Sequence, residues 1–195
     1  MEKDTYLNAG SPILSKTLSV DDRPDNVVVS GTFDLPVGRG KRFMSSANRV
    51  FLFALGNWQV GGAYTYFQGA PLAWGNLIYL GAPLDYHANL ANTASFNTAA
   101  FNTVSSQQLS NNYRTFPTYF NNLRIDSMNN FNANLTKSFV IHENLKLQFR
   151  AESFNLTNRV VFASPNLSAT SSTFGYITSD TNSPRAIQLA LRLTF

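Results

Sequence analysis

The chain contains no cysteine and little charge, and each absence removes a class of chemistry. Without cysteine in its 195 residues, it has no disulfide, no thiol nucleophile and no cysteine-based metal site. Charged residues make up 13% of the chain, about half of the usual share, whereas 13% of the residues are aromatic. This composition argues against intrinsic disorder, which requires few aromatic residues and much charge.

The chain also lacks any apolar run long enough to form a membrane-spanning helix. The longest run covers residues 50–55, far short of the roughly 20 residues that such a helix needs. If the chain crosses a membrane, we therefore expect it to cross as β-strands. The start, residues 1–5, has none of the features of a secretory signal peptide. The membrane interpretation thus predicts that the chain is the C-terminal piece of a longer protein.

The last ten residues alternate strictly between apolar and other side chains. A strand has a side-chain period of two, so this segment predicts a strand with one apolar and one mainly polar face. Such a strand invites aggregation in a soluble protein, but in an outer-membrane barrel its apolar face meets lipid. The apolar face carries Ile187, Leu189, Leu191, Leu193 and Phe195.

Four earlier segments alternate in the same way, so we expect strands over 26–35, 57–68, 129–141, 145–154 and 185–195. Lys137 interrupts one apolar face near the end of its strand, where its stem is expected to snorkel toward lipid headgroups. The candidate lipid-facing residues are Trp58, Val60, Tyr64, Phe131, Leu147, Phe149, Ile187 and Leu189. The candidate lumen-facing residues are Lys146, Gln148, Arg150, Glu152, Gln188 and Arg192.

The connections between these strands differ in length. A tight turn is expected at 142–144 and an intermediate connection at 36–54, within which 43–54 fits either a short helix or a strand. Residues 1–25 are predicted to be a leading loop, and 69–125 and 155–184 to be long outer loops. Short turns on one side and long loops on the other are typical of outer-membrane barrels, whereas such long loops are unusual in compact soluble domains. The predicted fold class is all-β, an antiparallel meander of about five amphipathic strands forming part of a transmembrane barrel.

No motif indicates catalysis, a cofactor or a metal, so we expect a protein that is not an enzyme. The segment 38–41 (GRGK) lacks the spacing of a phosphate-binding loop, and His87 and His142 lie far apart in sequence. The polar residues of strand 145–154 allow two interpretations: a lumen wall that contacts a plug or solute, or a solvated interior with weak ion pairs. Likewise, Trp74, Tyr79 and Tyr86 either grip a ligand such as a glycan or fold onto the barrel rim.

Several segments together resemble the C-terminal end of TonB-dependent outer-membrane receptors, in particular the Oar-like group with a carboxypeptidase-regulatory-like domain. The resemblance runs from about residue 22 to the end and depends on the order and spacing of these segments. They are 22–24 (DRP), 33–43 (FDLPVGRGKRF), 56–62 (GNWQVGG), 68–72 (QGAPL), 149–158 (FRAESFNLTN), 174–178 (FGYIT) and the terminal strand.

This resemblance implies a barrel of about 22 strands in the bacterial outer membrane, with this chain supplying roughly the last five. It implies uptake of a bulky solute driven by the TonB complex, which would act through a plug that these residues do not include. It also implies that Leu191, Leu193 and Phe195 form the signal read by the barrel-assembly machinery. The partners would be outer-membrane lipid and the rest of the receptor, with no nucleic acid. The alternative is a soluble or secreted all-β binding module, such as an adhesin or glycan-binding domain, in which the apolar faces would be buried between two sheets.

Overall fold

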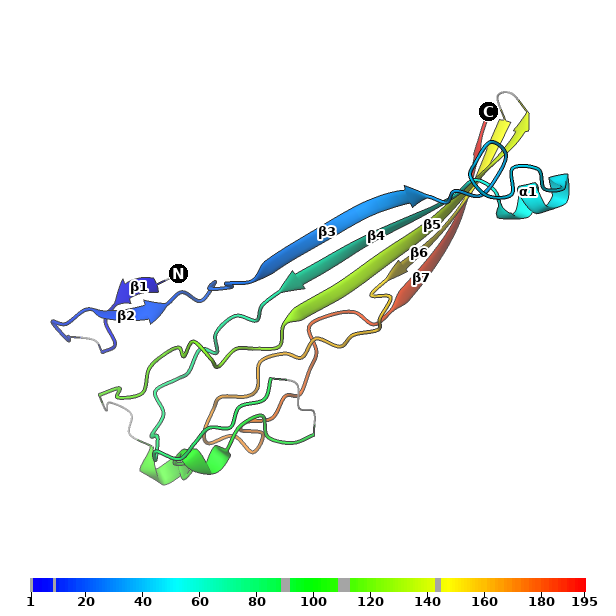
Figure 1. The fold of residues 1–195 in the computed structure, drawn as a ribbon. Helices are drawn as coiled ribbons and strands as arrows, with labels where there is room; N and C mark the ends of the chain where they lie inside the picture. The colour runs from blue at the N-terminus through cyan, green and yellow to red at the C-terminus, as the bar shows by residue number, and fades with distance from the viewer. Residues whose placement is uncertain (1, 9, 89–91, 109–112, 143–144) are drawn as a thin grey trace. The chain divides into compact units, whose positions relative to one another are not determined.

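The computed structural model describes residues 2–8, 10–88, 92–108, 113–142 and 145–195. The chain divides into two compact units, which are described separately (Figure 1). The sheet unit comprises Val27–Tyr66, Asn129–Arg159 and Ser183–Phe195. The loop unit comprises Met1–Asn26, Phe67–Met128 and Val160–Asn182.

The sheet unit is built on a five-stranded meander in which the spatial order follows the sequence (Figure 1). The predicted all-β fold class is confirmed, although the five strands do not close on themselves. Within the described chain, β3 and β7 are edge strands with one neighbour each. The strands are β3 (Asn26–Asp34), β4 (Trp58–Phe67), β5 (Met128–His142), β6 (Leu145–Phe154) and β7 (Ala186–Thr194).

The strand register keeps the polar and apolar faces continuous from one strand to the next. β6 pairs antiparallel with both β5 and β7, so that Phe149 lies opposite Lys137 and Leu191. Glu152, on the other face, lies opposite Asn134 and Gln188. Since directly opposed residues point to the same side of a sheet, the alternation in each sequence segment becomes a two-faced surface. The β5–β6 register is interrupted between Val140 and His142, beside residues 143–144, so the turn expected at 142–144 lies partly outside the described residues.

A turn that contains Asn155 and Asn158 follows β6, and hydrogen bonds from these two side chains hold the segment that leads into β7. Asn155 and Asn158 adopt φ angles of 49° and 51°, in the left-handed region that asparagine tolerates better than most residues. The Asn155 amide nitrogen donates to the carbonyls of Arg159 (3.0 Å) and Ser183 (3.1 Å). The Asn158 side chain accepts a hydrogen bond from the backbone N–H of Arg185 at 3.0 Å. The segment Asn155–Asn158 therefore sets where β7 begins.

The connection between β3 and β4 contains a short helix, α1 (Arg49–Leu55). Its N-cap is Asn48, whose side-chain oxygen accepts a hydrogen bond from the backbone N–H of Val50 at 3.3 Å. Of the two alternatives for 43–54, the structure therefore selects a helix for residues 49–55. Helix α1 lies at the end of the sheet where β7 ends (Figure 1). Among the described residues, no helix is both long and apolar enough to cross a membrane.

The loop unit contains a small hairpin that the sequence patterns did not predict. Strands β1 (Glu2–Thr5) and β2 (Ser15–Leu18) pair antiparallel, with Glu2 opposite Leu18 and Thr5 opposite Ser15. The expectation that residues 1–25 form only a leading loop is therefore wrong. The pattern missed these strands because four residues are too few to establish a period of two.

The rest of the loop unit has mostly irregular backbone but a packed aromatic core. Two 3₁₀ turns, η1 (Thr98–Ala100) and η2 (Ser105–Gln107), interrupt the irregular chain. Trp74 stacks on Phe101 with ring centroids 5.4 Å apart and meets Phe96 and Phe116 edge to face. Its side chain is 2% exposed, so the ligand-gripping interpretation is wrong for Trp74. The buried core consists of Leu72, Trp74, Leu77, Phe96, Ala100, Phe101, Phe116, Leu123, Ala169 and Phe174.

Two arginines connect the irregular segments of the loop unit. Arg114 donates to the backbone carbonyls of Trp74 and Phe116, and burial lowers its guanidinium pKa. Arg124 forms an ion pair with Asp22 (Nη2 to Oδ2, 2.5 Å), with both side chains almost fully buried, and also donates to the Gly69 carbonyl (Nη1 to O, 3.2 Å). These bonds satisfy backbone carbonyls that a strand ladder would otherwise pair.

Replacing Trp74 by alanine should loosen the loop unit. Removing a buried tryptophan side chain costs about 3–5 kcal/mol. The backbone around Trp74 is mostly irregular, so side-chain packing holds the segment. We expect faster cleavage within 67–128 during limited proteolysis of the folded protein in detergent. The matched control is Leu80→Ala in the same segment, where the side chain is 62% exposed. Equal protease resistance of the two variants would contradict the role of this core.

Candidate functional site

The polar face of the sheet carries the predicted lumen-facing side chains in aligned rows. Gln148 lies opposite Arg192 of β7 and Ser138 of β5. Arg150 lies between Thr136 and Ala190, and Lys146 between Val140 and Thr194. The structure thus brings the six predicted residues to one face, in the paired rows Gln148–Arg192 and Glu152–Gln188.

Direct contacts on this face are few and exposed. Arg150 and Glu152 form an ion pair (Nη2 to Oε1, 2.6 Å), but the arginine side chain is 51% exposed. Gln59 donates to the Asp34 carboxylate at 2.9 Å, linking β4 to β3. An exposed pair of this kind contributes only about 0–1 kcal/mol to stability. These groups therefore remain able to bind water or a polar partner.

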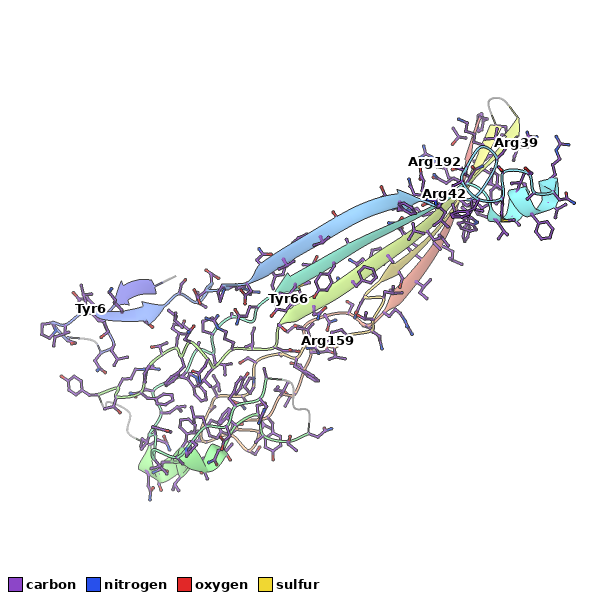
Figure 2. The ribbon with its side chains drawn as sticks, in the orientation of Figure 1. Tyr6, Arg39, Arg42, Tyr66, Arg159 and Arg192 are labelled. Atoms are coloured by element: carbon purple, nitrogen blue, oxygen red, sulfur yellow. The ribbon has the colours of Figure 1, made fainter. Side chains whose placement is uncertain are left out.

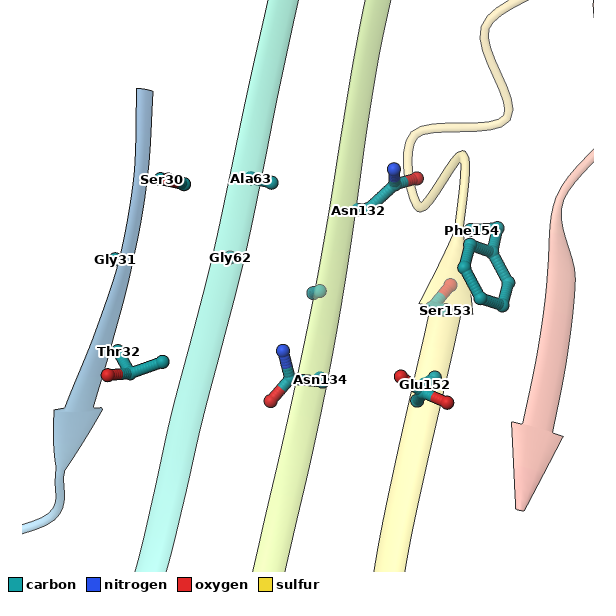
Figure 3. A pocket seen from close by; sticks show the side chains of 11 residues that line it. Ser30, Gly31, Thr32, Gly62, Ala63, Asn132, Asn134, Glu152, Ser153 and Phe154 are labelled. Atoms are coloured by element: carbon teal, nitrogen blue, oxygen red, sulfur yellow. The ribbon is translucent and has the colours of Figure 1, made fainter. Parts of the chain in front are cut away.

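A shallow depression runs across the polar face over four neighbouring strands (Figure 3). Its lining is rich in hydroxyl and amide groups and contains one carboxylate, from Glu152. This chemistry suits hydrogen bonding to neutral or weakly charged polar groups. Side chains that line it include Ser30, Thr32, Ala63, Asn132, Asn134 and Glu152.

Some of these residues were absent from the predicted lumen-facing set, although the sequence contained their signal. Asn132 and Asn134 alternate with Phe131 and Leu135 along β5. The amide of Asn134 lies against Gly61, where a Cβ would come within 2.5 Å of it. The glycine of β4 therefore makes room for the asparagine of β5. Alternation could have identified the two asparagines, but the close contact of Asn134 with β4 could be found only once the strand pairing was known.

The opposite face is apolar and largely uncovered. On β7, Ile187 and Leu191 are each 70% exposed and Leu189 is 66% exposed. The predicted residue Leu147 lies opposite Leu193, whereas Trp58 meets Phe149 edge to face with centroids 6.3 Å apart. Within the sheet unit, the five strands form one sheet.

Lys137 lies on this apolar face, but its side chain does not extend to solvent. Its ammonium donates to the carbonyls of Ala54 (3.0 Å) and Gly56 (2.6 Å), at the end of α1. It also lies over the rings of Trp58 (5.0 Å) and Phe139 (4.9 Å). Only 3% of Lys137 is exposed, so the expectation that it snorkels outward is wrong. A charge on an apolar face is costly, and here the end of helix α1 covers it.

The described residues hold no group of three or more histidine, aspartate or glutamate side chains placed to bind a metal.

Among ionisable groups outside the sheet, burial raises the pKa of Tyr86, and the charge of Asp126 adds to this effect. Tyr86 packs against the aromatic core of the loop unit, so this shift follows from its packing.

Replacing Lys137 by methionine should release helix α1 from the sheet. The substitution removes two charge-assisted hydrogen bonds, each worth about 1.5–3 kcal/mol, but leaves an apolar side chain on the apolar face. We expect trypsin to cleave after Arg49 faster than in the unsubstituted protein. Lys146→Met, which removes a lysine from the polar face, is the control and should leave this rate unchanged. Unchanged cleavage in Lys137→Met would show that the lysine does not hold the helix.

Comparison with known proteins agrees with the two-faced sheet. Residues 3–188 match the family described as "Outer membrane beta barrel domain". Searches of curated proteins and of solved structures found no match. The match covers nearly the whole chain and places it in the bacterial outer membrane, with lipid as a partner. The chain therefore belongs to the outer membrane β-barrel domain family.

Proposed function

We propose that this chain is the C-terminal wall segment of a TonB-dependent receptor of the Oar-like group. The observation that carries the proposal is the register that aligns β5, β6 and β7, within a five-stranded sheet, into one polar and one apolar surface. In the proposed orientation, the apolar surface meets lipid and the polar surface lines the lumen. The exposure of Ile187, Leu189 and Leu191 supports this orientation over a soluble sandwich, in which a second sheet would bury them.

The edges of the sheet support a larger barrel. In lipid, the free backbone groups of β3 and β7 each need a neighbouring strand, because no water is available there to satisfy them. A receptor barrel of about 22 strands would supply both neighbours from the same polypeptide. The segments 69–125 and 155–184 would be its outer loops, with α1 and the end of β7 on the periplasmic side.

The proposed role of this segment is passive. Its polar face would contact a plug or the passing solute through hydroxyl, amide and charged side chains, without chemical conversion. Leu191 and Leu193 lie on the apolar face, and Phe195 follows β7 with 94% of its surface exposed. Phe195 continues the alternation of Leu191 and Leu193, which supports the proposed role of these three residues as the signal for the barrel-assembly machinery.

Two neighbouring substitutions on β7 test the orientation of the wall. Leu189→Arg would place a charge in lipid, at a cost of about 2–4 kcal/mol near the middle of the bilayer. Gln188→Arg, one residue away, would place the same charge in the lumen and cost little. We expect only Leu189→Arg to lower the amount of heat-modifiable barrel in outer membranes. Equal losses, or a larger loss for Gln188→Arg, would reject the orientation.

The receptor assignment is tested on the protein isolated from outer membranes. We expect peptides of this chain to occur on one polypeptide that also carries a plug and further strands. That polypeptide should cross-link to the periplasmic domain of TonB through a segment outside these residues. A polypeptide with strands but neither plug nor TonB cross-link would leave an outer-membrane barrel and reject the receptor.

A further inference from the structure

Helix α1 exposes a dense set of apolar side chains that the sheet does not cover. Val50 is 72% exposed, Phe51 56% and Phe53 67%. The seven-residue helix buries none of its residues, although six of the seven are apolar. Water would not favour such a surface, because contiguous exposed apolar side chains usually mark a contact site.

The contacts between α1 and the sheet show on which side of the sheet the helix lies. Its last turn is tied to Lys137, which belongs to the apolar face of β5. Two further contacts hold the helix there: Trp58 donates from Nε1 to the Ala54 carbonyl at 3.0 Å, and Phe53 lies 4.9 Å from Phe139 between ring centroids. The helix therefore lies on the apolar side of the sheet, and its exposed side chains extend that surface.

Basic residues cluster in the segment that leads into the helix. The cluster contains four basic side chains, and all of them are exposed. They lie within eleven positions, and no acidic residue occurs between them. Figure 2 labels Arg39 and Arg42 at the end of the sheet where α1 lies. Basic groups beside an anionic membrane surface are attracted to its phosphate groups. The four are Arg39, Lys41, Arg42 and Arg49. Lys41 lies toward the polar face, in a depression that Gln59 and Gln148 also line.

We propose that residues 39–55 form an interfacial anchor that binds phospholipids of the leaflet at this end of the barrel. The apolar side chains of α1 lie among the upper acyl chains, and Arg39, Arg42 and Arg49 bind the phosphate groups. This arrangement is typical of helices that lie in the membrane interface. The inference rests on the proposed orientation of the sheet, with its apolar face toward lipid.

Phospholipid fits this surface better than another protein does. The surface continues the lipid-facing side of the barrel wall, so bilayer lies where a protein partner would have to dock. A stable protein contact buries about 800 Å² on each partner, more than a helix of two turns provides. A phospholipid satisfies both features of the segment, because it offers an apolar chain and an anionic headgroup in one molecule.

Single cysteines provide the test, because the natural chain contains none. Val50→Cys and Phe51→Cys report on the helix, Leu189→Cys on the apolar face and Gln188→Cys on the polar face. Each variant is labelled with an environment-sensitive fluorophore in protein reconstituted into phosphatidylcholine–phosphatidylglycerol vesicles. Quenching is compared between lipid carrying a nitroxide near the headgroup and aqueous iodide. Heat modifiability confirms that each variant is folded.

We expect the fluorophores at 50 and 51 to be quenched several-fold more by the lipid nitroxide than by iodide. Quenching by iodide alone at 50 and 51, with lipid quenching at 189, would overturn the anchor and leave the barrel wall intact. Protection of 50 and 51 from both quenchers would also overturn it, because protein would then cover the helix. Absence of lipid quenching at 189 would reject the wall orientation itself, and the anchor with it.

Discussion

Pairing of backbone hydrogen-bond groups is the constraint on which the rest of this structure depends. A segment inside a bilayer has no water to satisfy its N–H and C=O groups, so every strand must pair with its neighbours. The pairing fixes the register, and the register fixes the faces. In β5, β6 and β7 it places Phe149 between Lys137 and Leu191, and Glu152 between Asn134 and Gln188. A shift of one residue would exchange the two faces, which explains why the Asn155–Asn158 turn is held by several side-chain bonds.

The same constraint explains why Lys137 is accompanied by a helix. A lysine in the apolar row opposes the alternation around it, and in lipid its ammonium would lack partners. The carbonyls at the end of α1 supply them: Ala54 and Gly56 both accept hydrogen bonds from Lys137. The carbonyls at the end of a helix carry partial negative charge, so they suit a cation. Lys137, which interrupts the apolar row of β5, and helix α1, which lies between β3 and β4, therefore depend on each other: the lysine holds the helix, and the helix supplies hydrogen-bond partners for the lysine.

The sequence predicted the sheet well because the signal in each strand is local. Alternation over nine or more residues, as in β5 and β7, identifies the strand and assigns its faces without knowledge of its partners. The position of the Lys137 side chain could not be predicted in this way. Its partners lie 81 and 83 residues earlier in the chain, and a lysine near a strand end is equally compatible with snorkelling. The β1–β2 hairpin was missed for a different reason, since its strands are too short to show a period.

The aromatic residues serve two separate purposes, which composition alone could not distinguish. The sheet unit needs no apolar core of its own, because lipid covers its apolar face in the proposed orientation. The loop unit has little regular secondary structure, so it must bury side chains to be stable. It does so with rings such as Trp74, Phe96 and Phe101, which are almost fully buried, while Phe51 and Phe53 of α1 remain exposed. A phenylalanine count therefore indicates neither a core nor a membrane surface; only the strand period and the packing tell them apart.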